Sequence, residues 1–180
     1  MGNPGAEYRY IRHNIGWMIV GALREKWRAA ETERQFQGRV SRKRIRGREC
    51  LLLTPLTYMN RSGASVALMC RTLQLTTADL LVVFDAADLD FGTLRLRRKG
   101  GSGGHNGVQS IIDSMGSENF PRLKFGISGA GREENQLKEY VLAEFTPEEK
   151  QDLPGKIAAA VQRIEGWAFD GIDAAMNRFN

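Results

Sequence analysis

The sequence contains two histidines, His13 and His105, and an asparagine directly follows each of them. Imidazole can take up or release a proton near neutral pH, so both histidines are candidates for acid–base chemistry. A lone histidine at the start of a helix more often contacts its own backbone. The His-Asn pair recurs here at two expected helix starts, which favours a shared site.

Carboxylate and carboxamide side chains stand at other expected junctions of the fold. Asp85 follows an apolar run, and Asn3, Asn60 and Asn106 lie in expected turns and loops. Asp85 could hold the imidazole of His13 in one tautomer and stabilise its protonated form, although aspartate is also a common turn former. The carboxamides could donate hydrogen bonds to a peptide group or to a developing oxyanion.

Other catalytic patterns are missing from the sequence, which has no serine nucleophile elbow, no Walker lysine loop and no metal-ligand spacing. Histidine, aspartate and carboxamides together indicate a water molecule, activated by a base, that attacks an acyl carbon. We therefore expect neither a metal ion nor an organic cofactor.

An α/β framework is needed to bring these residues together. Strand-like runs are expected over 36–45, 49–54, 80–84, 93–98 and 120–127, and helical spacing over 15–30, 62–73, 108–115 and 147–177. The alternation predicts one domain over residues 1–180, a three-layer sandwich in which a mixed, mostly parallel, twisted sheet is flanked by helices. Strand ends in such a sheet share one crevice, where distant polar residues can meet.

The loop 100–107 is rich in glycine and lies between an expected strand and an expected helix. Glycines allow positive φ angles and close approach of another surface. The N–H groups and dipole at a helix start favour an anion there. A flexible linker that ends in a cap at Asn106 is the alternative, and Ser62 is the expected cap of the helix that follows it in sequence.

Composition and charge limit the class of protein. The chain has 180 residues, 42% of them hydrophobic, a formal net charge of +5 and a pI near 9.5, which indicates a globular protein and suggests a polyanionic partner. Arg95, Arg97 and Lys99 share one strand face and suit a phosphate backbone. Cys50 and Cys70 are expected to be free thiols. With no long apolar run and no signal peptide, we expect a cytoplasmic protein without a membrane span.

Several motifs together resemble the bacterial-type peptidyl-tRNA hydrolases. The opening signature is Gly2-Asn3-Pro4-Gly5, Tyr8, Arg12-His13-Asn14 and Gly16. Further matches, in order, are Tyr58-Met59-Asn60, Ser62-Gly63, Asp85, Gly103-Gly104-His105-Asn106-Gly107 and Phe120-Pro121-Arg122-Leu123. The resemblance extends over nearly the whole chain.

This resemblance implies a role for each matching residue. His13 would be the general base that activates water against the ester between peptide and tRNA, with Asp85 supporting it. Asn3 would bind the peptide backbone and separate blocked from free aminoacyl-tRNA. Met59 would form the floor of the site and His105 would lie in its gate region.

The resemblance also implies how the partner is bound. Substrate-binding positions would be Tyr8, Tyr58, Asn60 and Asn106. Arg97 and Lys124 would contact the 5′ phosphate next to the tRNA acceptor stem. The protein would act as a monomer.

One departure concerns the start of the fold. The family carries an apolar β-strand directly before the Gly-Asn-Pro-Gly turn, whereas here Met1 precedes Gly2. We expect the neighbouring strands to lack this partner and some core side chains to be uncovered. Two alternative functions stay open: a non-catalytic RNA- or protein-binding member of the fold, similar to plant organelle splicing partners, and a nucleotide-binding domain. The second lacks a G-x-G-x-x-G motif after the first strand.

Overall fold

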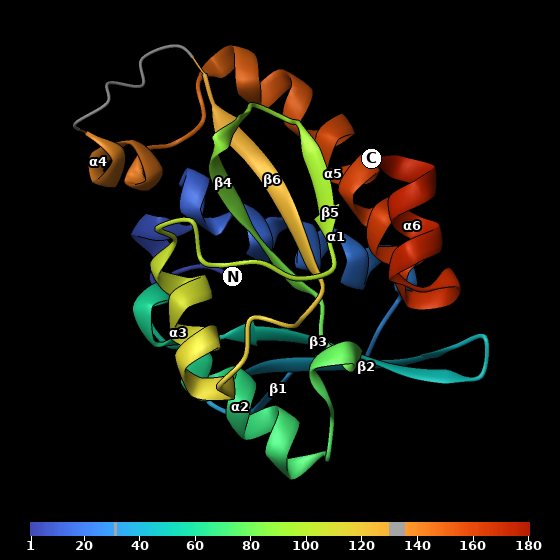
Figure 1. Cartoon of the computed structure of the whole chain (residues 1–180). Coiled ribbons are helices and arrows are strands. Elements are labelled where there is room, and N and C mark those ends of the chain that lie inside the picture. The colour runs from blue at the N-terminus through green and yellow to red at the C-terminus, as the bar shows by residue number, and fades with distance from the viewer. Residues whose placement is uncertain (31, 130–135) are drawn as a thin grey trace.

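Two three-stranded sheets with helices packed on them form the structure, a computed structural model that describes residues 1–30, 32–129 and 136–180 (Figure 1). The first sheet has the order β1-β2-β3, with β1 (Glu33–Gln35), β2 (Gly38–Ile45) and β3 (Arg48–Pro55). The second has the order β4-β6-β5, with β4 (Val82–Asp90), β6 (Arg122–Ser128) and β5 (Leu94–Arg97). The charged loop that the sequence indicates after β6 falls largely outside the described residues.

The helices follow the expected apolar spacing for the most part. In chain order the α-helices are α1 (Ile15–Trp27), α2 (Ser62–Thr72), α3 (Asn106–Met115), α4 (Leu137–Leu142), α5 (Pro147–Asp170) and α6 (Ile172–Phe179). Short 3-10 helices are η1 (Ala6–Tyr8), η2 (Arg12–Asn14), η3 (Met59–Arg61) and η4 (Thr77–Asp79).

The α/β class and the mixed strand directions are confirmed, but the expectation of a mostly parallel sheet is wrong. Only β4 and β6 run parallel among the described strands, whereas β1-β2, β2-β3 and β5-β6 are antiparallel. The short connections between β1 and β2, β2 and β3, and β4 and β5 reverse the direction of the chain. Arg46 and Gly47 join β2 to β3, and both have positive φ, the geometry of a two-residue hairpin turn.

The β4-β6-β5 sheet has helices on both of its faces, which gives the expected layers (Figure 1). Alternation along β4 places Val83 on the face covered by α1 and α5, and Val82 and Phe84 on the face toward α2 and α3. The core on the face covered by α1 and α5 contains these fully buried side chains: Ile15, Ile19, Leu23, Leu96, Leu123, Phe125 and Ile127. Each such side chain contributes roughly 1.5–3 kcal/mol by leaving water.

Some expected boundaries are corrected. β4 does not end before Asp85 but continues, with a register shift between Ala86 and Asp90, to Asp90. The last expected helix is two helices, because Gly171 interrupts it with φ of 86°. Ser62 is the first residue of α2 and forms no cap, since η3 runs directly into the helix.

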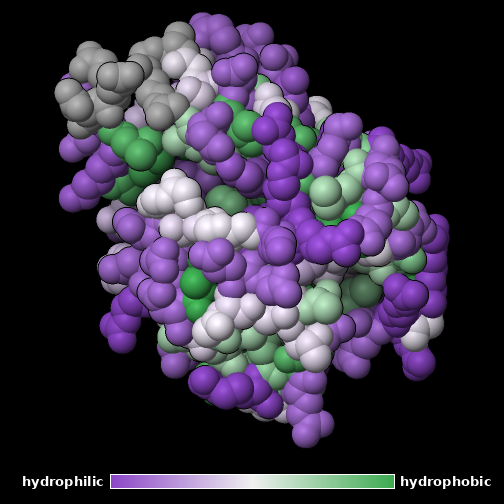
Figure 2. All heavy atoms as spheres, viewed as in Figure 1, coloured by the Kyte–Doolittle hydropathy of each residue, from purple (hydrophilic) through white to green (hydrophobic). Residues whose placement is uncertain are grey.

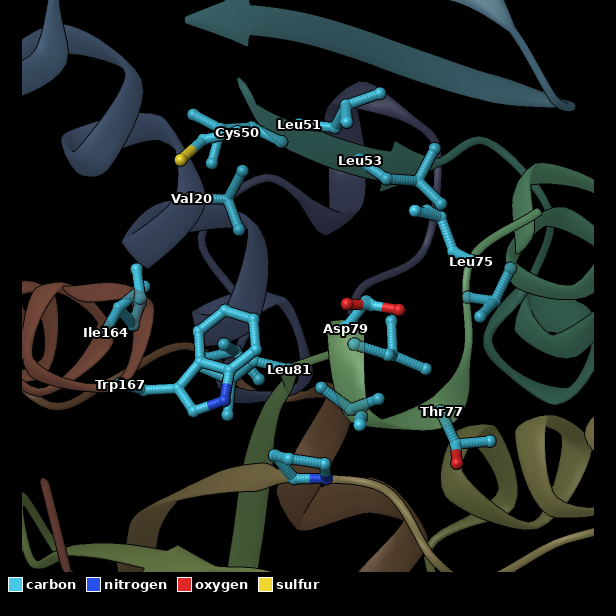
Figure 3. Close-up of a pocket in the computed structure, with 18 of the residues that line it drawn as sticks. Val20, Cys50, Leu51, Leu53, Leu75, Thr77, Asp79, Leu81, Ile164 and Trp167 are labelled. Atoms are coloured by element: carbon cyan, nitrogen blue, oxygen red, sulfur yellow. The ribbon is translucent and has the colours of Figure 1, made fainter. Parts of the chain in front are cut away.

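An apolar groove of about 670 Å³ lies between β3 and the start of β4 (Figure 3). Half-buried side chains line it, among them Leu51, Leu53, Leu81 and Trp167. Within the described ranges, β3 pairs only with β2 and β4 only with β6. Met1 lies at the groove and its amine donates to the Val83 carbonyl at 2.7 Å.

No helix in the described part of the chain combines the length and the apolar character needed to cross a bilayer.

Candidate active site

His13 reaches the sheet because α1 approaches β4 closely. Its 3-10 helix, η2, leads directly into α1, and the second residue of α1 is Gly16. A Cβ atom at Gly16 would lie 2.2 Å from the Met1 nitrogen and 2.5 Å from the Val83 oxygen. A side chain would therefore push η2 away from β4, so glycine is needed here.

Arg12 fixes η2 from the other side. Its guanidinium is buried, bonds Glu149 at 2.6 Å and the Glu144 carbonyl, and lies 4.4 Å from the centre of the Tyr140 ring. The bond to Glu149 ties η2 to the start of α5. Both hydrogen-bond partners lie more than 130 residues away in sequence, so the motif around Arg12 does not reveal this role.

His13, Asp85 and His105 form one hydrogen-bonded cluster. The Nδ1 atom of His13 lies 2.8 and 2.9 Å from the two carboxylate oxygens of Asp85, and His105 Nε2 lies 3.0 Å from Oδ1. Burial opposes ionisation of Asp85, but the hydrogen bonds that His105 and His13 donate outweigh it. They hold the pKa of the Asp85 carboxyl well below its usual range. The predicted pairing of His13 with Asp85 is therefore present.

His105 also contacts the backbone at the start of α3. It is the cap of α3, because its Nδ1 accepts hydrogen bonds from the N–H groups of Gly107 and Val108. An Nδ1 that accepts carries no proton, so Nε2 holds the hydrogen and donates it to Asp85. The alternative of Asn106 as cap is wrong, since Asn106 is the first helical residue. The link from His105 to Asp85 was not foreseen.

The glycine loop before His105 adopts the expected backbone. Gly103 and Gly104 have φ of 56° and 80°, which few other residues adopt. Arg122, buried beneath the loop, donates to the carbonyls of Gly101 and Glu118 at 3.0 and 2.9 Å. These bonds anchor the start of the loop, a role that the Phe-Pro-Arg-Leu motif alone does not indicate.

Asn3 is buried beside the histidine cluster and tightly held. Its Oδ1 accepts from the Met59 N–H at 2.8 Å, and Asn14 contacts its main chain. Met59 is buried, and a Cβ at Gly107 would lie 2.5 Å from its sulfur, so the Met59 side chain packs against the start of α3. Asn14, next to His13 in sequence, was not foreseen as a site residue.

The remaining predicted residues have no hydrogen bond to the cluster. Tyr58, Asn60 and Asn106 are exposed and Tyr8 is half-buried. Among the described residues, none of the four has a hydrogen bond to His13, Asp85 or His105. Such side chains are free to contact a ligand.

A basic face lies on the second sheet, made of Arg95, Arg97 and Lys124. Arg95 and Lys124 are cross-strand partners, and Lys124 also aligns with Phe84 of β4, whose ring contacts His105 at 5.0 Å. This register connects the basic face to the histidine cluster. Figure 2 shows mainly hydrophilic residues where β5 and β6 lie.

Lys124 has one ion-pair partner on this face. It bonds Asp88 at 2.6 Å. Burial disfavours the charge on Asp88, but the bond and charge of Lys124 prevail and lower the pKa of that carboxyl. An anion that binds Lys124 must therefore compete with Asp88.

The histidine cluster has the geometry of a metal site, since ligand atoms of His13, Asp85 and His105 lie within 4.8 Å of one another. Their hydrogen bonds favour a different use. His105 Nε2 carries a hydrogen because its Nδ1 accepts two backbone bonds, so it offers no lone pair to a cation. None of the three lines the apolar groove of Figure 3.

Comparison with known proteins agrees with these features. A family model described as "Peptidyl-tRNA hydrolase" matches residues 1–180. The peptidyl-tRNA hydrolase of Symbiobacterium thermophilum is 43% identical over 182 residues, which cover 100% of this chain and 96% of the relative. That of Desulforudis audaxviator is 43% identical over 180 residues, covering 100% of this chain and 90% of the relative.

Solved structures are similar along the same length. The Acinetobacter baumannii peptidyl-tRNA hydrolase has a TM-score of 0.91 at 34% identity, covering 99% of this chain and 91% of that one. A peptidyl-tRNA hydrolase complexed with N-propanol has a TM-score of 0.92 at 34% identity, covering 100% and 91%. Whole-length matches in sequence and in structure lead to one conclusion. This chain belongs to the peptidyl-tRNA hydrolase family.

Proposed function

We propose that this protein hydrolyses the ester bond between the peptide, or an N-blocked aminoacyl group, and tRNA in peptidyl-tRNA, and so returns tRNA to translation. One observation carries the proposal: His13 donates from Nδ1 to the Asp85 carboxylate. Its Nε2 takes no hydrogen bond from the described residues, which leaves a lone pair directed away from Asp85. We further propose that the protein acts as a monomer in the cytoplasm.

The reaction needs one base and one water molecule. Nε2 of His13 takes a proton from water as the water oxygen attacks the ester carbonyl carbon. Asp85 stabilises the imidazolium that forms. The imidazolium then gives its proton to the ribose oxygen as the carbon–oxygen bond breaks, so that the products are the peptide acid and tRNA.

Asn3 recognises the acyl part of the substrate. Its Oδ1 is occupied by the Met59 N–H, so its NH2 group, which bonds no other described residue, is the available donor. This donor fits a peptide carbonyl next to the ester and does not fit the ammonium of a free aminoacyl group. Around it, Tyr8, Tyr58, Asn60 and Asn106 contact the rest of the substrate.

The tRNA binds through its 5′ phosphate and acceptor stem. The basic face supplies the positive charge. Arg97 and Lys124 on this face bind the phosphate and act as a clamp. A phosphate would displace Asp88 from Lys124, since both are anions that need the same ammonium.

A non-catalytic RNA- or protein-binding role is the alternative. It requires no proton acceptor, yet His13 and Asp85 lie at bonding distance and are supported by His105. A nucleotide-binding role is less suited still, because the start of α3 is capped by an imidazole rather than open to a phosphate.

The first test compares release of tRNA from N-acetyl-aminoacyl-tRNA by the chain and by His13→Ala, with Arg9→Ala as control at an exposed residue. We expect activity in the chain and in the control, and loss of at least about a thousandfold in His13→Ala. Equal activity in all three proteins would refute the mechanism. A folded chain that binds tRNA without turnover would favour the alternative.

A second test addresses the phosphate clamp. Arg97→Ala with Lys124→Ala should weaken substrate binding and reduce the slope of log affinity against log salt by about 1 to 2, without changing the chemical step. Arg34→Ala with Arg44→Ala removes the same charge from exposed residues of the other sheet. Equal effects of the two double variants would show that net charge, rather than a clamp, decides binding.

A further inference from the structure

Asn14 occupies the N-cap position of α1, yet its side chain does not cap the helix. It is 1% exposed. Its Oδ1 accepts from the Asn3 N–H at 2.7 Å, and its Nδ2 donates to the Asn3 carbonyl at 3.0 Å. An asparagine at this position ordinarily satisfies a free N–H of its own helix. Here both of its groups are used on another residue.

The consequence falls on Asn3, which is held at three points. Asn14 holds both main-chain groups, and the Met59 N–H holds Oδ1. This third bond also fixes which end of the carboxamide is oxygen and which is nitrogen. The NH2 group is left as a donor whose position and direction are determined by the other contacts.

We propose that Asn14 is a positioning residue for Asn3 and thereby sets the selectivity for substrates with a blocked amino group. The inference rests on the recognition role given to Asn3 under the proposed function. A donor selects a carbonyl over an ammonium only while it points at the place where the carbonyl lies. A misplacement of about 1 Å is enough to weaken such a contact greatly.

A purely structural role for Asn14 makes a different prediction. Two buried hydrogen bonds attach residues 1–3 to η2, and their loss would lower stability whatever Asn3 does. Selectivity, expressed as a ratio of two rates by the same enzyme, is unaffected by the fraction that is folded. It separates the two roles.

The experiment compares kcat/KM for N-acetyl-aminoacyl-tRNA and for free aminoacyl-tRNA in the chain, Asn14→Ala, Asn3→Ala and the double variant. We expect Asn14→Ala to lower the ratio of the two values by at least about tenfold. Adding Asn14→Ala to Asn3→Ala should change the ratio no further, because Asn14 acts through Asn3. Asn14→Asp keeps the acceptor for the Asn3 N–H and should fall between Asn14→Ala and the unaltered chain.

Ser65→Ala is the matched control, since it removes another buried side-chain bond, from Ser65 Oγ to the Phe36 carbonyl at 2.6 Å. It should lower the melting temperature and leave the ratio unchanged. If Asn14→Ala and Asn14→Asp behave like Ser65→Ala, this inference is overturned while the proposed function stands. A folded chain inactive on the blocked substrate overturns both.

Discussion

Converting the amine of Met1 to an amide should stabilise the protein below pH 8. The amine is buried and donates to the Val83 carbonyl at 2.7 Å. Burial lowers its pKa from 8.0 to about 5, although the nearby Asp85 carboxylate acts in the opposite direction. The unfolded chain therefore binds a proton at this group between pH 5 and pH 8 that the folded chain does not bind.

The sign and size of the effect follow from this difference. Stability rises with pH wherever the unfolded state binds more protons, so the cost is complete below pH 5 and disappears above pH 8. Three pKa units at 1.36 kcal/mol each give a total on the order of 4 kcal/mol. Between pH 6 and pH 7 the free energy of unfolding should increase by about 1 kcal/mol from this group alone.

Urea unfolding of the free-amine and Nα-acetylated proteins at pH 6, 7, 8 and 9 measures the effect. The acetylated nitrogen keeps an N–H for Val83 but cannot take a proton, and the adjoining groove offers space for the acetyl group. Other titrating groups are common to both proteins and cancel in the difference. A difference in unfolding free energy that stays constant from pH 6 to pH 9 would refute the reasoning.

Two further predictions concern the site and its support. Asp85→Asn should keep the fold and reduce the single-turnover rate of ester cleavage by roughly 10³–10⁴, because His13 loses the partner that sets its tautomer; a rate within tenfold of the original would contradict this. Gly16→Ala should cost more than about 2 kcal/mol in urea unfolding, since its Cβ would overlap main-chain atoms. Gly21→Ala in the same helix, where a Cβ meets nothing within 4 Å, should instead stabilise by up to about 1 kcal/mol, and similar results for both glycines would show that α1 can shift freely.

Local patterns in the sequence predicted much of the framework. The 3.6-residue spacing placed α1, α2 and α3. Strand direction was less predictable, because alternation of strands and helices does not show that β5 returns antiparallel to β6. The extension of β4 past Asp85 was also missed, since Asp-Ala-Ala-Asp has the composition of a turn.

Within the site, residue type predicted the members but not their contacts. His13, Asp85 and Asn3 could be selected because their chemistry fits ester hydrolysis. The roles of Asn14, Arg12 and the His105 imidazole depend on tertiary approach. Asparagine is a common N-cap, so sequence alone favours a cap for Asn14, and it offers no reason to expect histidine as the cap of α3.

The two histidines share one carboxylate, and the backbone decides which of them can act as the base. Each imidazole uses one nitrogen on Asp85. The second nitrogen of His105 accepts two N–H groups at the start of α3, and protonating it would break both bonds and place positive charge at the positive end of a helix. The second nitrogen of His13 has no such partner among the described residues, so its lone pair is open to a water molecule. Asp85 thus has a hydrogen-bond donor fixed by the backbone on one side and the general base on the other, which is the asymmetry that general-base hydrolysis requires.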